Sequence, residues 1–401
     1  MSSFRWRAAN SAFFPLSQLR RSPSKLDSLA SSEIASTTTS GRGRLEPPSA
    51  ERQKHILIVG GAYSGLSTII TLQKILSGAP HDPGPYNLPP VPRLPRVRPR
   101  VTLLDERDGC YHTVGKPLAH TSPDVSTAVP RAWKRFADIP YLEDVAVVRG
   151  SVQHMDPLRK TVVYTTYGAC IGEQQQQQQQ YSLSYNYIVC ATGLKRDWPA
   201  QPRAMAKAEY IRDATALVQG LADAKEGVVV VGGGLFPPIP FPFQDPKKLS
   251  QCRGGGNGFA GELKLTYPGK VTTLVHSRSS LLSSEPLPEE FKAKALKLLE
   301  EIGVEVLFNT RMETEADGGG GRRELVLSTG TVLRASAVLW CVGRQQPSAG
   351  FLPESTLHSD SGLVRVSASF NLPQEVPNHT AHLPWATWCI GRGSSAAAAR
   401  C

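Results

Sequence analysis

The stretch "HILIVGGAYSGLSTIITLQKIL", residues 55–76, decides the fold of this chain. A short apolar run from Ile56 to Val59 leads into a cluster of glycines. Apolar residues of helical period then follow through Leu66, Ile69, Ile70 and Leu72. A strand, a tight turn and a helix in this order predict the opening of a βαβ unit.

The glycine cluster has the composition of a turn that approaches a dinucleotide. Gly60 permits the tight turn out of the strand, and Gly65 permits close packing of the helix on the strand. At the middle position, where the backbone would approach a pyrophosphate, Ala62 adds one methyl group. The N–H groups at the start of the helix would face phosphate. We therefore predict a binding turn made of Gly60, Gly61, Ala62, Tyr63, Ser64 and Gly65.

The next predicted strand, "VTLLDERD", ends in carboxylates. Either Asp105 or Glu106 would accept hydrogen bonds from ribose hydroxyl groups. Asp105 follows Gly65 by 40 residues instead of about 20, because a Pro-rich loop at 78–100 intervenes. An ordinary loop cluster of glycines is the alternative interpretation.

A second unit of the same kind begins at "GVVVVGGG", residues 227–234. It is interrupted by a Pro-rich segment at 235–258, and the sequence predicts that the helix resumes at Phe259. The following strand ends in "VHSR" without an acid. Arg278 there would accommodate a 2′-phosphate, which permits NADPH, or would simply be solvated. We predict that Gly232, Gly234 and Arg278 bind the second nucleotide, and that the chain is an α/β protein with two tandem Rossmann-like domains.

Composition and charge restrict the classes of function. The net charge of the 401-residue chain is +11, of which residues 1–54 and 77–101 supply +8, so that the remaining body is nearly neutral. A nucleic-acid partner is therefore disfavoured. No run of 18 apolar residues predicts a transmembrane helix. The seven Cys lack paired spacing, which indicates neither a zinc site nor a disulfide framework.

The first 53 residues are basic and rich in serine. They are predicted to be a disordered extension, with a mitochondrial transit peptide as the alternative. The corresponding locations are cytoplasmic and mitochondrial.

Six segments together carry a family resemblance: "ILIVGGAYSGLS", "VTLLDERDGCYHTVGKPLAHTS", "KRFADIP", "YIVCATGLKRDWP", "GELKLTYPGKVTTLVHSRSSLLSSEPLPEEFK" and "EIGVEVLFNTR". They resemble the fungal branch of the apoptosis-inducing-factor-like flavoproteins. These are similar to the pyridine-nucleotide-disulfide-oxidoreductase superfamily and to the ferroptosis-suppressor type of NAD(P)H:quinone reductase. The resemblance covers roughly residues 55–380 and implies a glutathione-reductase-like fold.

The resemblance implies FAD in the first domain and NAD(P)H as the electron donor in the second, with a quinone-like acceptor. Ala191, Thr192 and Gly193 would hold FAD, and the backbone of Val152 would contact its adenine. Lys116 would be the catalytic residue near the flavin, or else a solvated loop lysine. Cys110 has no partner at CxxxxC spacing, which disfavours disulfide-reductase chemistry.

The resemblance also divides the chain. After the extension at 1–53, it implies a FAD-binding part at 54–205, a NAD(P)-binding domain at 206–338 with the insertion 235–258, a return to the FAD-binding domain at 339–382, and a tail at 383–401.

The tail lacks the Gly-Asp that closes the FAD domain in such families, and the family's last strand is expected to be missing. Restoring one base at Leu383 permits the peptide "FALGDVVYWSGIKRCGGAM", which resembles the closing motif. We therefore interpret residues 383–401 as a frameshifted reading.

Three other functions stay open. They are a flavin monooxygenase, an apoptosis-type flavoprotein that acts by interaction, and a catalytically impaired or inert product of a damaged gene. Peripheral membrane association and the oligomeric state are also left open.

Overall fold

The computed structural model describes residues 53–79, 97–166, 179–199, 201–233, 255–283, 287–342, 346–384 and 389–391. The predictions for the N-terminal extension through residue 52, for Gly234 and for most of the insertion and tail lie outside these described residues.

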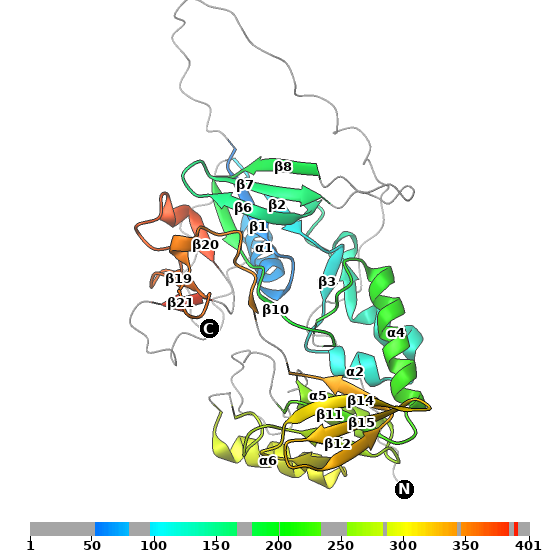
Figure 1. The fold of residues 1–401 in the computed structure, drawn as a ribbon. Coiled ribbons are helices and arrows are strands. Elements are labelled where there is room, and N and C mark those ends of the chain that lie inside the picture. The colour runs from blue at the N-terminus through cyan, green and yellow to red at the C-terminus, as the bar shows by residue number, and fades with distance from the viewer. Residues whose placement is uncertain are drawn as a thin grey trace, which may run out of the picture. The chain divides into compact units, whose positions relative to one another are not determined.

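The first glycine turn belongs to a five-stranded parallel sheet with the order β20-β9-β1-β2-β5. Figure 1 shows β1 and β2 of this sheet together with α1. Its central strands are buried on both faces, which is why they read as continuous apolar runs. Helix α1 packs through Leu66 and Ile69 on one face. The strands and the helix are β1 (His55–Val59), β2 (Arg100–Asp105), β5 (Val145–Arg149), β9 (Tyr187–Cys190), β20 (His382–Pro384) and α1 (Tyr63–Leu76).

The opposite face of this sheet packs against an antiparallel layer and C-terminal segments. Met155 and Val162 of that layer share a core cluster with Leu57 and Ile188 of the sheet. The glutamines Gln179 and Gln180 begin strand β8. The elements are β6 (Ser151–Asp156), β7 (Thr161–Thr166), β8 (Gln179–Ser184), β19 (Val364–Val366) and β21 (Cys389–Gly391).

The second glycine turn belongs to a four-stranded parallel sheet with the order β13-β12-β11-β17. Phe291, Ala295 and Leu296 of α6, with Ile302 at its C-terminal end, pack on its core, whereas Leu298 is exposed. An antiparallel meander precedes β17. The elements are β11 (Val228–Val231), β12 (Thr272–Val275), β13 (Glu305–Leu307), β17 (Ala337–Trp340), α5 (Gly256–Thr266), α6 (Glu289–Glu301), β14 (Met312–Gly319), β15 (Arg322–Leu327) and β16 (Val332–Ala335).

A further group of short elements, which no sequence pattern predicted, surrounds the buried side chains of Trp133 and Tyr210. Helix α2 in this group contacts α5, which is the helix of the second glycine turn. The group therefore connects the elements around the first turn to those around the second. The group contains β3 (Gly109–Tyr111), β4 (Trp133–Arg135), α2 (Lys116–Thr121), α3 (Val125–Arg131) and α4 (Lys207–Asp223). Outside this group, β10 (Leu194–Lys195) pairs with β18 (Gln346–Pro347).

Two parallel sheets in one chain confirm the predicted α/β class. One expectation was wrong, because the last strand of the first sheet is present. Strand β20 pairs with β9, and the buried imidazole of His382 holds it through Nε2 to the Tyr185 hydroxyl at 2.9 Å and through Nδ1 to the Asn378 carbonyl oxygen at 2.8 Å. The interpretation of the tail as a frameshift stays a prediction.

Close packing of α1 on β1 generates a stability prediction. A Cβ built on Gly65 would overlap the carbonyl oxygen of Gly60, whereas a Cβ on Gly220 of α4 meets nothing within 4 Å. We expect Gly65→Ala to lower the free energy of unfolding by about 1–3 kcal/mol. The control Gly220→Ala should raise it by about 0.5–1 kcal/mol, because a helical alanine replaces glycine. Urea titration measures both, and equal stability of the two variants would contradict the packing argument.

Candidate cofactor site

The first turn is held so tightly that two of its positions admit no side chain. Gly60 has φ +101° and donates its N–H to the Leu104 carbonyl oxygen at 2.9 Å. A Cβ on Gly60 would lie 2.5 Å from the carbonyl oxygen of Ala191, and one on Gly65 would overlap the Gly60 carbonyl. The predicted roles of these two glycines in the turn therefore match the geometry.

The two predicted carboxylates separate in the structure. Asp105 at the end of β2 accepts hydrogen bonds from the backbone N–H of Gly61 at 2.6 Å and of Arg107 at 2.7 Å. Burial raises the pKa of Asp105, and these two N–H groups oppose that shift because they stabilise the charged form. Glu106 instead accepts a hydrogen bond from Ser151 Oγ at 2.7 Å, beside the half-buried Val152. Only Asp105 lies at the turn.

The start of α1 is open to an anion. Ala62 is the N-cap residue and makes no side-chain capping bond, so the first N–H groups of the helix, at Tyr63 and Ser64, have no side-chain cap. A small hollow lies beside them. Its lining consists of Gly61, Ala62, Asp105, Arg107, Gly109, Cys110, Tyr111, Thr113 and Gln201.

Arg107 supplies a charge that the sequence analysis missed, although it follows the predicted acids directly. Its Nη2 donates to the Pro202 carbonyl oxygen at 3.4 Å, but its buried Nε has no hydrogen-bond partner among the described residues. An unpartnered guanidinium N–H beside an uncapped helix start fits the diphosphate of a dinucleotide such as FAD.

Tyr63 fastens the loop before α2 to this turn. Its hydroxyl lies 2.6 Å from Nδ1 of His112 and accepts the N–H of Val114 at 3.3 Å. Burial raises the pKa of Tyr63, so the hydroxyl stays protonated. The loop from Tyr111 to Gly115 therefore begins and ends close to the helix start.

The predicted segment Ala191–Gly193 also lies at the turn. Ala191 donates its N–H to the Val59 carbonyl oxygen at 2.7 Å, and Thr192 Oγ1 donates to the Ser348 carbonyl oxygen at 3.0 Å. Ser348 in turn donates its N–H to the Gly193 carbonyl oxygen at 3.1 Å. No pattern in the sequence singled out Ser348, because its role depends on a contact over 150 residues away.

The second turn repeats the first, with one displaced glycine. Gly232 has φ +105° and donates its N–H to the Val275 carbonyl oxygen at 2.8 Å. A Cβ on Gly256 would overlap the Gly232 carbonyl, so Gly256 takes the part of Gly65. Helix α5 therefore begins at Gly256, and the predicted start at Phe259 was wrong by three residues. Gly234 lies outside the described residues.

His276 follows the last residue of β12, at the position that corresponds to Asp105 at the end of β2. Gly233 donates its N–H to His276 Nδ1 at 3.1 Å, and the imidazole is buried. Arg278, two residues further on, is exposed. The structure thus brings His276 to the second turn and leaves Arg278 on the surface beside it.

Lys116 is fully buried at the start of α2, so its interpretation as a solvated loop lysine was wrong. Its Nζ lies 5.1 Å from the ring centroid of Phe259 in the first turn of α5. Burial lowers the pKa of Lys116 to about 7, and the nearby Cys341 opposes this shift while Arg196 adds to it. Lys116 therefore lies where α2 packs on the helix of the second turn.

The described cysteines do not favour thiol chemistry. Cys110 and Cys341 form no disulfide, and burial raises the pKa of each thiol to about 12. Within the same ranges, no group of three or more His, Cys, Asp or Glu side chains is arranged for a metal ion. None of the described helices has both the length and the apolar character needed to cross a membrane.

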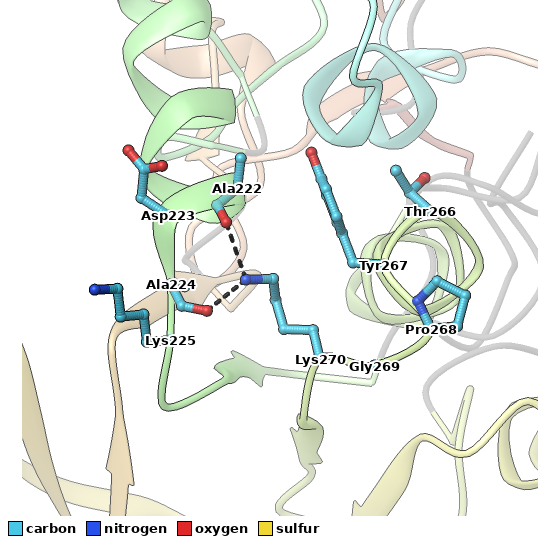
Figure 2. Close-up of a pocket in the computed structure, with 9 residues that line it drawn as sticks. All are labelled: Ala222, Asp223, Ala224, Lys225, Thr266, Tyr267, Pro268, Gly269 and Lys270. Carbon is cyan, nitrogen blue, oxygen red and sulfur yellow. Dashed lines mark hydrogen bonds between the residues drawn. The ribbon is translucent and has the colours of Figure 1, made fainter.

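A second hollow lies at the C-terminal ends of α4 and α5 and contains none of the predicted site residues. Figure 2 shows Lys270 directed at the carbonyl oxygens of Ala222 and Ala224, to which it donates hydrogen bonds. Its Nζ also lies 5.5 Å from the centroid of the Tyr267 ring. The lysine thus caps α4, and the hollow shows no arrangement for catalysis.

Comparisons with known proteins show which proteins this chain is similar to. The model of the pyridine nucleotide-disulphide oxidoreductase family matches residues 256–368. Oxidoreductase OXR1 of Ajellomyces capsulatus is 34% identical over 357 residues, which are 86% of this chain and 70% of that protein. Human ferroptosis suppressor protein 1 is 24% identical over 319 residues, which are 78% of this chain and 69% of that protein.

Solved structures share the fold. The ferredoxin reductase of the CYP199A2 system from Rhodopseudomonas palustris has a TM-score of 0.55 at 14% identity, over 84% of this chain and 69% of that chain. A water-forming NADH oxidase from Lactobacillus brevis, bound to NADH, has a TM-score of 0.52 at 14% identity, over 83% and 62%. With its two glycine turns and its relatives, the chain belongs to the pyridine nucleotide-disulphide oxidoreductase family, whose members bind FAD and use NAD(P)H.

Proposed function

We propose that this chain is a FAD-dependent oxidoreductase that takes hydride from NAD(P)H and passes electrons to a quinone-like acceptor. The observation that carries the proposal is the repetition of one turn geometry in two parallel sheets of the same chain. One turn is paired with a carboxylate and the other with an imidazole, so the two sites suit different nucleotides.

The first turn would hold FAD, which supplies the two-electron chemistry when it is bound. Gly60 and Gly65 leave room for the backbone to approach, and the start of α1 together with Arg107 would bind the diphosphate. The free lone pairs of Asp105 would accept hydrogen bonds from ribose hydroxyls. Val152 would contact the adenine through its backbone, as the family resemblance implies.

At its position between the two nucleotide sites, Lys116 would carry a positive charge and would hold or release a proton. A lysine whose pKa is about 7 exchanges a proton at Nζ near neutral pH. In a buried position its positive charge stabilises negative charge that develops nearby far more than it would in water. The ring of Phe259 and the packing of α2 on α5 fix the position of Nζ.

The proposed acceptor is a small quinone-like molecule, because the thiols of Cys110 and Cys341 lack the low pKa that disulfide reduction needs. The nearly neutral body supports the absence of a nucleic-acid partner. A cytoplasmic location remains our proposal, with a mitochondrial one as the alternative. A catalytically inert product is the competing hypothesis, and retention of flavin separates the two.

The first measurement is the visible absorption spectrum of the purified full chain. We expect bound-flavin bands that bleach on anaerobic addition of NADH or NADPH and return on addition of a short-chain quinone. Asp105→Ala should lose most of the bound flavin, because the turn loses the carboxylate that holds Gly61 and Arg107. A colourless wild-type protein would favour the inert product.

Lys116 generates a prediction about pH. Its pKa is lowered on folding, so at this group the unfolded chain binds more protons, and Lys116 contributes a rise in the free energy of unfolding from about pH 7 upward. The raised pKa values of Cys110 and Cys341 oppose this rise from about pH 9. Lys116→Met should abolish this rise and slow flavin bleaching by NAD(P)H. The exposed Lys297→Met in α6 is the matched control and should leave both unchanged. Denaturant titrations across this pH range test the idea, which fails if Lys116→Met keeps the wild-type profile.

The interpretation of the tail as a frameshifted reading can be tested by replacing residues 383–401. A chain in which residues 383–401 are replaced by "FALGDVVYWSGIKRCGGAM" should bind FAD at least about tenfold more tightly, since an added Asp contact to the cofactor contributes a charge-assisted hydrogen bond. Equilibrium dialysis against FAD measures the difference. Equal affinity of the two chains would count against the frameshift.

A further inference from the structure

As far as their second glycine, the two turns correspond residue by residue, and this correspondence assigns a position to His276. Val59 pairs with Leu104 between β1 and β2, and Val231 pairs with Val275 between β11 and β12. The residues that directly follow Leu104 and Val275 are Asp105 and His276. Each receives the N–H of the second glycine of its turn, from Gly61 or from Gly233 respectively.

The hydrogen bonds of His276 keep its ring neutral and fix its tautomer. Nδ1 accepts the Gly233 N–H, so the proton is on Nε2, which donates to the Ser280 carbonyl oxygen at 2.9 Å. Burial lowers the pKa of His276; the Ser280 carbonyl opposes this shift, and the charge of Arg278 reinforces it. The imidazole thus fills the place of the acid and brings no negative charge.

Because His276 replaces the carboxylate, the second turn differs from the first in whether it accepts a ribose with a 2′-hydroxyl or one with a 2′-phosphate. A carboxylate at this position accepts hydrogen bonds from the 2′-hydroxyl of NADH and repels a 2′-phosphate. The segment Ser277–Ser283 that follows His276 contains the exposed Arg278 and several serine hydroxyls, but no Asp or Glu. Guanidinium and hydroxyl donors are the groups that bind a phosphate monoester.

We propose that His276 and Arg278 make the second site selective for a donor that bears a 2′-phosphate, so that NADPH is preferred to NADH. The inference rests on the proposed function and specifies the donor of the same site. His276 acts by keeping a carboxylate out of the turn while holding Gly233 in place. Arg278 acts by contacting the phosphate.

The test separates recognition of the nucleotide from the redox reaction. Binding of adenosine 2′,5′-bisphosphate and of 5′-AMP to the full chain is measured by isothermal titration calorimetry. We expect the bisphosphate to bind about tenfold to hundredfold more tightly, as a charge-assisted contact implies. Arg278→Ser should weaken the bisphosphate by about tenfold and leave 5′-AMP unchanged. The exposed Arg212→Ser in α4 is the matched control and should change neither.

His276→Asp should reverse the preference, because Gly233 would then face a carboxylate as Gly61 does. Equal binding of the two fragments to the wild-type chain, or an equal loss of both in Arg278→Ser, would overturn the inference. The visible absorption spectrum of the flavin distinguishes failure of the proposed selectivity from failure of the proposed function. A flavin that bleaches equally fast with NADH and NADPH overturns the selectivity alone. A flavin that bleaches with neither removes the proposed function as well.

Discussion

Both halves of this chain depend on the same steric constraint, which is the contact of a helical glycine with a strand-end carbonyl. Gly65 lies on the Gly60 carbonyl and Gly256 lies on the Gly232 carbonyl, with no room for a Cβ at either place. This contact brings the start of the helix to the end of the strand. The uncapped N–H groups therefore face the place where the next strand ends, and the residues of each turn are arranged around that point.

The residue at the end of the neighbouring strand then decides the chemistry of each turn. Asp105 and His276 accept equivalent backbone N–H groups, so either side chain completes the turn structurally. Their charges differ, and the ribose that each turn favours differs accordingly. Lys116 is placed by a separate constraint, the packing of α2 on α5, which buries the side chain completely beside Phe259.

The sequence was sufficient for those features that depend on neighbours along the chain. The two strands with their glycines, Asp105 and the class of fold follow from local pattern. Arg107, Ser348 and the burial of Lys116 do not, because each depends on contacts between segments distant in sequence. The same limit explains why α5 was placed three residues late: Gly256 reads as one of several loop glycines until its contact with Gly232 is known.

The long segment inside the second turn is compatible with this geometry for a physical reason. Three residues separate Gly61 from Gly65, whereas 22 separate Gly233 from Gly256. From chain length alone, a connection that is longer by nearly three doublings would cost about 2 kcal/mol of closure entropy. Packing of Phe259 and Leu263 in the core of the second sheet offsets a cost of this size, since each fully buried large apolar side chain contributes about 1.5–3 kcal/mol. The position of α5 is therefore set by its buried face and by Gly256, and the length of the chain that leads into the helix is of secondary importance.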